Sequence, residues 1–229
     1  MTMWPQRCSR QFRVALALGT VIVGLVPVRS QAQVAPPPGW RWGTDRPARM
    51  TSEWNMPDSS WRFVQMAPGW HITTRPGALM YDPAIQATGS YVLESIQILF
   101  PGTTQSGYGL FFGGRNFDGP GAHYVAFLAR RDGHVAVEEH RDSTATTLIP
   151  WTQAPSVQQV TGDKTARNVF RIAVRHDSVL FEVNGVRVAA TARTAQSLDG
   201  FFGFRTGPDL NLHVTTLDYT RRLAPVPKT

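Results

Sequence analysis

Residues 168–189 read NVFRIAVRHDSVLFEVNGVRVA, and this stretch decides the fold class. Phe170, Ile172 and Val174 share one parity, which is the period-two pattern of a strand with one buried face. The Asn184-Gly185 dipeptide favours a two-residue hairpin turn, because both of its residues tolerate a positive φ. The stretch therefore predicts consecutive antiparallel strands rather than a helix.

The same pattern extends outward in both directions along the chain. Residues 123–137 read HYVAFLARRDGHVAV, with Asp132-Gly133 as a second hairpin signal. Runs rich in β-branched and aromatic residues, separated by turn residues, predict strands at 61–66, 69–74, 78–81, 91–100, 108–113, 123–131, 134–141, 146–149, 168–175, 178–183, 186–190, 201–205 and 212–219. Many short strands without an amphipathic helical pattern predict an all-β protein, a two-sheet antiparallel jelly-roll sandwich.

The N-terminus, residues 1–32, is predicted to be a signal peptide. Three arginines precede an uncharged apolar run at residues 14–28, and the small residues Ser30 and Ala32 follow it. The run is shorter than the roughly 20 residues of a transmembrane helix. Cleavage after Ala32 leaves an exported chain, periplasmic or extracellular, with no transmembrane segment; an uncleaved anchor is the alternative.

Removal of this segment changes two properties of the chain. The formal net charge of +7 includes four arginines of the signal, so the mature chain carries only about +3. A nucleic-acid partner is therefore not expected. The only cysteine, Cys8, also lies in the signal, so the mature chain has neither a disulfide nor thiol chemistry.

The segment 33–60 is interpreted as a linker or as a wrapping segment of the domain. It begins QVAPPPG, and consecutive prolines favour an extended polyproline geometry. The sandwich is expected to span 61–222, and residues 223–229 to form a tail.

Five of the seven tryptophans fall between residues 40 and 70. Aromatic faces can stack on the C–H groups of sugar rings, so Trp40, Trp42 and Trp54 are candidate ligand-binding residues on an exposed face. The alternative is that these rings fill the core and its edge, as is expected for Trp61 and Trp70.

Four landmarks resemble a known superfamily: GYGLFFGG (107–114), residues 123–137, residues 168–189 and DGFFGFRTG (199–207). Together they resemble the concanavalin A-like lectin/glucanase superfamily, most closely its laminin-G-like branch, which includes 3-keto-disaccharide hydrolase domains and many domains of unknown function. The resemblance implies a jelly roll with a concave face that often meets sugars. Glycines in the first landmark allow a ligand or another backbone to approach closely, or simply tight packing.

The carboxylates of a laminarinase-type glycosidase are not found. That machinery needs a Glu-x-Asp-x-x-Glu or similar string on one strand, with two carboxylates about 5 Å apart. The longest predicted strand has Glu94 alone, with Ile96 and Ile98 at the other positions. Retaining hydrolysis of that kind is therefore not expected.

The nearest substitute is the run VEEHRD at 137–142. Glu138, His140 and Asp142 share a parity, so they would lie on one face and are the candidate catalytic residues. Val135 and Val137 should face the core, which puts the trio on the opposite face. A solvated polar strand face is the alternative interpretation.

No cofactor is predicted. Asp82, Asn116 and Asp118 are loop residues whose oxygens could bind calcium, but no dense string of ligands supports such a site. The histidines are dispersed, so no zinc site is predicted.

These features favour a non-catalytic exported domain that binds carbohydrate or a cell-envelope partner. Two alternatives stay open: a sugar-acting hydrolase resembling the 3-keto-disaccharide hydrolases, and a structural envelope protein without a small ligand. The oligomeric state has no signature in the sequence.

Overall fold

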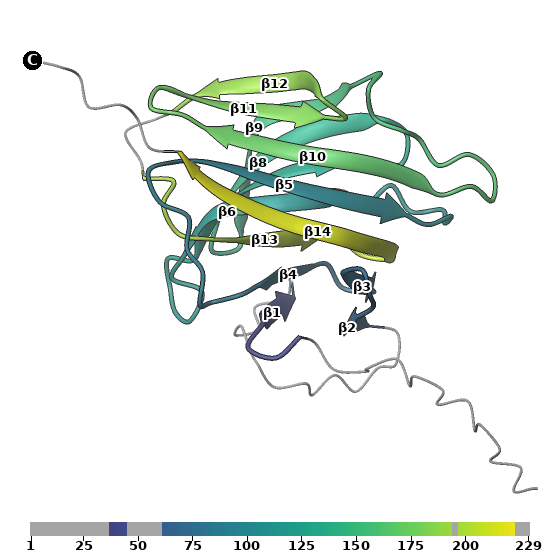
Figure 1. Ribbon diagram of the computed structural model, residues 1–229, viewed down its shortest axis with the longest axis horizontal. Coiled ribbons are helices and arrows are strands. Elements are labelled where there is room, and N and C mark those ends of the chain that lie inside the picture. Colours follow the sequence, from purple (N-terminus) through teal and green to yellow (C-terminus); the bar gives the residue numbers. More distant parts are fainter. Residues whose placement is uncertain (1–36, 45–60, 194–196, 223–229) are drawn as a thin grey trace, which may run out of the picture. The chain divides into compact units, whose positions relative to one another are not determined.

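The computed structural model describes residues 37–44, 61–193 and 197–222. These residues form two seven-stranded antiparallel sheets (Figure 1). The predicted signal peptide, most of the predicted linker and the predicted tail lie outside these residues. Within the described ranges, no helix is long and apolar enough to cross a membrane.

Each sheet combines strands from distant parts of the sequence. Sheet A has the order β1 (Arg41–Thr44), β4 (Ala78–Tyr81), β13 (Phe201–Thr206), β6 (Tyr108–Arg115), β7 (His123–Ala129), β8 (His134–Arg141) and β9 (Thr144–Gln153). Sheet B has the order β12 (Val186–Ala192), β11 (Ser178–Val183), β10 (Ala166–Val174), β5 (Ser90–Leu99), β14 (Leu210–Arg222), β3 (Trp70–Thr74) and β2 (Arg62–Gln65). The predicted jelly-roll sandwich is confirmed, and β1 adds an edge strand within the segment interpreted as a linker or wrapping segment.

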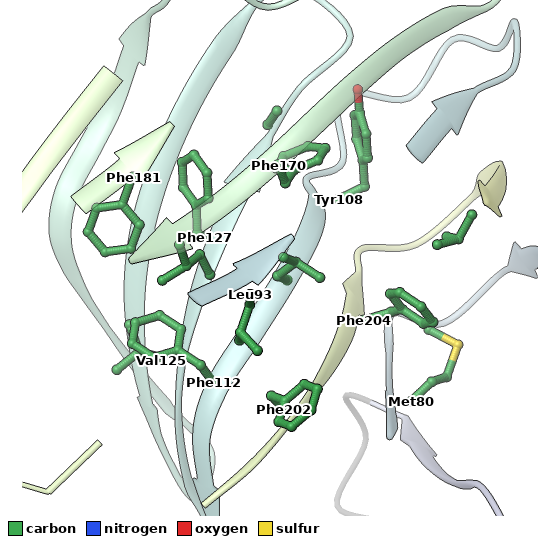
Figure 2. Packing of buried hydrophobic residues seen from close by; sticks show 14 of the residues in the cluster. Met80, Leu93, Tyr108, Phe112, Val125, Phe127, Phe170, Phe181, Phe202 and Phe204 are labelled. Atoms are coloured by element: carbon green, nitrogen blue, oxygen red, sulfur yellow. The ribbon is translucent and has the colours of Figure 1, made fainter. Parts of the chain in front are cut away.

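The core lies between the two sheets and is built by the alternation read from the sequence. Phe170, Ile172 and Val174 are all buried, as predicted. Across the core, the ring centroid of Phe127 in β7 lies 5.7 Å from that of Phe170 in β10 and 5.1 Å from that of Phe181 in β11 (Figure 2). Burying each such ring contributes about 1.5–3 kcal/mol, so the facing aromatic layers hold the sheets together.

One side of the core contains a buried polar network centred on Asn168. Its Nδ2 donates to the hydroxyl of Tyr108 (3.0 Å) and to the carbonyl of Gln158 (3.0 Å), and its Oδ1 accepts from the Gln158 amide (2.8 Å). Asn184 Nδ2 also donates to Asn168 Oδ1 (2.9 Å). Burial raises the pKa of Tyr108 to about 12, so its hydroxyl stays neutral. Because every partner is satisfied, the network links β10 to the loop before it and to the β11–β12 turn.

The two predicted hairpins differ in the structure. Asn184 and Gly185 both have positive φ values (53° and 79°), so the predicted two-residue turn is confirmed. At the other hairpin only Gly133 has a positive φ, and β7 ends at Ala129 rather than at the predicted residue 131. The prediction of a two-residue turn there was wrong: the Arg130 amide still donates to the carbonyl of His134 (2.8 Å), so the turn has three residues, 131–133, and the Gly133 amide closes it on the carbonyl of Arg130 (3.1 Å).

Candidate functional site

Sheet A buries side chains on both of its faces. Its inner face meets sheet B; on its outer face, the face turned away from sheet B, a second apolar cluster includes Tyr81, Phe111 and Tyr124. Phe117, from the loop after β6, packs on this cluster with its ring centroid 5.8 Å from that of Phe111. The cluster extends to Leu128 and Trp151 near the start of β6, where it borders a hollow.

That hollow, hereafter the Trp151 pocket, has a volume of about 400 Å³. Strand and turn side chains, an adjoining loop and two glycines form its wall: Leu128, Arg130, Glu138, Trp151, Arg205, Thr104, Gln105, Ser106, Gly107 and Gly207. It combines one aromatic ring with three charged groups and a polar loop, so most of its lining is polar.

The position of the Trp151 ring depends on Gly107, which has no side chain to collide with it. A Cβ at Gly107 would lie 2.9 Å from Cη2 of Trp151 and 3.2 Å from Cδ1 of Leu128. The glycine therefore allows the indole to lie against the start of β6, which is the tight packing given above as the alternative explanation of the glycine pattern. Trp151 itself is half-buried, so part of the ring borders the pocket.

Arg130 enters the pocket from the turn between β7 and β8. Its guanidinium carbon lies 3.7 Å from the centroid of the Trp151 ring, which is a cation–π contact. Its Nε is buried and has no hydrogen-bond partner among the described residues. The aromatic ring thus fixes the position of the guanidinium while leaving donor capacity for another group.

Glu138 lies in β8 with its carboxylate in the pocket and its Oε2 3.3 Å from Nε2 of His140. The imidazole of His140 stacks on the ring of Tyr124, with centroids 4.4 Å apart and planes 7° apart. The hydrogen bond from His140 holds the pKa of Glu138 below its ordinary value, against the opposing effect of burial, and the charges of Arg205 and Arg130 act in the same direction. Glu138 is therefore an anion at neutral pH.

The polar loop at 104–106 is ordered by its own contacts. Arg131 Nε donates to the carbonyl of Thr104 at 2.6 Å. The hydroxyls of Thr104 and Ser106 lie 2.8 Å apart, and the Ser106 amide donates to Thr104 Oγ1 at 3.2 Å. Consequently this loop, which lines the pocket, is held in one conformation, which favours binding without a large ordering cost.

Of the three candidate catalytic residues, the structure brings only two together. Glu138 and His140 lie together on the outer face of sheet A, in the positions that their parity predicts. Asp142 does not join them, because the chain turns there with φ 50°, and its Oδ1 accepts from the amides of Gly121 (2.7 Å) and Ala122 (3.0 Å). The prediction that all three share one face was wrong for Asp142.

Two of the three candidate tryptophans can be placed. Trp42 is only 5% exposed and packs on Trp61 with ring centroids 4.4 Å apart, so its expected exposure was wrong. Trp40 is half-buried among Phe63, Trp70 and Phe204, with its ring centroid 5.2–5.6 Å from theirs. Both pack on the core because β1 joins the edge of sheet A.

The third candidate, Trp54, lies outside the described residues. The aromatic ring of the pocket is instead that of Trp151. The strand predicted at 146–149 ended before this residue, whereas β9 includes it. The residue after the predicted strand is Pro150. β9 continues past it because it is an edge strand, where the missing N–H of a proline is tolerated.

The loop oxygens considered for calcium make other contacts. Asp82 accepts from the Ala84 amide at 2.9 Å, and Asp118 pairs with Arg41 at 3.0 Å. Asn116 Nδ2 donates to the carbonyl of Gly121 at 3.2 Å. In the described part of the chain, no group of three His, Cys, Asp or Glu residues is arranged to hold a metal ion.

No protein-family model matches this chain, and no curated protein matches it in sequence. Solved structures match it at the level of the fold. The carbohydrate-binding module CBM66 from Bacillus subtilis shares 11% identity over 83% of this chain and 98% of its own, with a TM-score of 0.56.

Two further structures give the same result. A protein of unknown function with a galectin-like fold from Bacillus subtilis shares 11% identity over 79% of this chain and 88% of its own, at a TM-score of 0.54. The Bacteroides ovatus mixed linkage glucan GH16, in complex with a G4G4G3G product, shares 7% identity over 79% of this chain and 94% of its own, at a TM-score of 0.51. The protein therefore has the concanavalin A-like, galectin-like sandwich fold that the sequence resemblance implied.

Proposed function

We propose that this domain binds carbohydrate without acting on it, and that a short stretch of glycan occupies the Trp151 pocket. The observation that carries the proposal is the pocket itself, in which an indole lies beside a fixed polar loop and charged hydrogen-bonding groups. Sugars are bound by this combination, because an aromatic ring covers their C–H groups while polar side chains pair with their hydroxyls. A volume of about 400 Å³ suits a ligand of one or two sugar rings.

The fold similarity supports this proposal in a general way. The structural neighbours of the chain include a carbohydrate-binding module and a GH16 protein in complex with a G4G4G3G product. At identities of 7–11% they share the fold alone. The choice of a sugar ligand for this chain therefore rests on the chemistry of the pocket.

Export to the periplasm or cell exterior is part of the proposal. It is supported by the basic start, apolar run and small-residue exit of residues 1–32. N-terminal sequencing of the protein recovered from a bacterial host should give a mature chain that begins near Gln33. An intact N-terminus on a protein that stays with the cytoplasmic fraction would contradict export.

The binding proposal is tested by titrating the mature domain with a panel of soluble glycans. Because the indole borders the pocket, a bound glycan should shift the tryptophan fluorescence saturably. Trp151→Ala should weaken binding by about 30-fold, as expected for loss of an aromatic anchor. Leu148→Ala is the matched control: it shortens an exposed apolar side chain of the same strand and should leave the affinity unchanged.

If no glycan in the panel binds, the proposal fails and the interpretation as a structural envelope protein gains weight. Equal affinities of Trp151→Ala and the unaltered protein would mean that a sugar binds, but elsewhere.

A sugar-acting hydrolase is the second candidate, and the Glu138–His140 hydrogen bond on the pocket side of β8 favours it. Among the described residues that line the pocket, however, Glu138 is the only carboxylate, whereas hydrolysis by the usual acid and base or nucleophile needs two. Turnover of any glycan in the panel, lost in Glu138→Gln, would establish the enzyme. Stable binding without new reducing ends would support the binding domain.

A further inference from the structure

We propose that the Trp151 pocket selects an acidic sugar, a glycan unit with one carboxylate, and that Arg130 binds that carboxylate. This inference rests on the proposed carbohydrate-binding function and narrows its ligand class. It is carried by the position of one guanidinium and by the charges around it.

The charges of the described lining residues do not balance. Arg130 and Arg205 are cations, and Glu138 is the only carboxylate among those residues. One oxygen of that carboxylate, Oε2, already accepts a hydrogen bond from His140. The lining residues therefore carry an excess of one positive charge, within a hollow where partial burial strengthens electrostatic attraction relative to water.

Arg130 is the cation best placed to receive an anion. Its guanidinium carbon lies 3.7 Å from the centroid of the Trp151 ring, so the cation–π contact fixes the position of the charged group. Its buried Nε has no hydrogen-bond partner among the described residues. Because the protein encloses that atom, a ligand meets the guanidinium through its two terminal nitrogens, Nη1 and Nη2.

A carboxylate fits this guanidinium better than other anions do. Its two oxygens in one plane match the fork of an arginine and form two parallel hydrogen bonds. A dianionic phosphate would place a second negative charge near Glu138 in a pocket with an excess of only one positive charge. Glu138 and the loop hydroxyls are suited to the neutral hydroxyls of the remaining sugar ring.

The test compares pairs of ligands that differ only in charge. Methyl glycosides of glucuronate, galacturonate and mannuronate are titrated against the corresponding methyl esters, and binding is followed on the indole N–H signals of the ¹⁵N-labelled mature domain. At least one acid should bind about tenfold more tightly than its ester, as expected for a charge-assisted pair. This preference should decrease as sodium chloride is raised, because salt screens partly exposed charges.

Two variants with the same change of net charge separate the pocket from the rest of the surface. Arg130→Gln should remove the preference for the acid while the ester still binds. Arg167→Gln removes an exposed arginine from sheet B and should leave the preference intact.

Each other outcome has a distinct meaning. If esters or neutral glycans bind as well as the acids, or if Arg130→Gln keeps the preference, the acidic-sugar inference is overturned and the carbohydrate-binding function stands. If neither acids, esters nor the neutral panel binds, both proposals fail. A sulfated monosaccharide that binds while no uronate does would also overturn the assignment of a carboxylate.

Discussion

The outer faces of sheets A and B carry similar charged residues but use them differently. On sheet B, Arg171 Nη1 lies 2.8 Å from Glu182 Oε2, and its Nε lies 3.7 Å from Glu94 Oε2. On sheet A, Arg130 lies on an aromatic ring, and its Nε has no partner among the described residues. An arginine between two carboxylates is already neutralised, whereas an arginine held by a ring keeps its charge for a ligand.

A hollow of about 430 Å³ on sheet B makes the comparison direct, since it is as large as the Trp151 pocket. Its lining includes Arg171 and Glu94, which pair with each other, and Asn184, which belongs to the Asn168 network. No aromatic residue is among the side chains that line it. We therefore assign the polar groups near the sheet B hollow to stability and those of the Trp151 pocket to binding.

The largest expected effect concerns stability, on the side of sheet B. Asn168→Ala should lower the free energy of unfolding by about 3 kcal/mol, because it leaves the Tyr108 hydroxyl and backbone groups of Gln158 unpaired in a buried place. Urea denaturation measures the loss. Glycan affinity of the folded fraction should be unchanged.

The control for this prediction is Gln65→Ala, an exposed position of β2 in the same sheet. It should change stability by no more than about 0.5 kcal/mol. A small effect of Asn168→Ala, comparable with this control, would show that the network contributes little to the free energy of unfolding.

The next effect concerns binding, on the side of sheet A. Gly107→Ala places a Cβ 2.9 Å from the Trp151 ring, so the ring must move. We expect about a tenfold loss of glycan affinity, equivalent to 1.4 kcal/mol, with little loss of secondary structure by circular dichroism. Calorimetric titration measures the affinity.

Gly119→Ala is the matched glycine control, because no atom lies within 4 Å of the Cβ it would add. It should bind like the unaltered domain. Undiminished binding by Gly107→Ala would mean that the position of Trp151 is not important for the ligand.

A smaller effect is expected from the ion pairs of sheet B. Arg171→Gln should reduce the free energy of unfolding by at most about 1 kcal/mol, since the pairs are partly exposed and screened by salt. Thermal unfolding in low and high salt measures this contribution. A change in glycan affinity in this variant would contradict the assignment of the sheet B ion pairs to stability alone.

The smallest effect is a pH dependence on sheet A. The pKa of Glu138 is lowered by folding, so its ionised form stabilises the folded state fully above the ordinary value of 4.5, and this contribution is lost as the pH falls through the lowered pKa. The stability difference between the unaltered protein and Glu138→Gln should be constant from pH 7 to 5. It should then shrink below about pH 4.5.

Urea titrations of both proteins at several pH values measure this difference, which we expect to be a few tenths of a kcal/mol, because the pair is partly exposed. A difference that grows as the pH falls would contradict the ionised state assigned to Glu138.

The alternation of apolar residues by itself determined that this protein is an antiparallel sandwich. Phe170, Ile172 and Val174 face the core because side chains of a strand alternate whatever its partners are. The same local rule placed Glu138 and His140 on one face. It failed for Asp142, where a positive φ ends the alternation.

Only the tertiary structure decided where the pocket lies. Arg130, Trp151 and Arg205 come from a turn and two strands that are distant in sequence, and the pairing of β13, β6, β7, β8 and β9 brings them to one end of sheet A. Likewise, Trp42 is buried because β1 pairs with β4. Alternation is a property of each strand alone, whereas the register and order of strands depend on contacts between distant residues, and that is why the sequence indicated the faces but not the site.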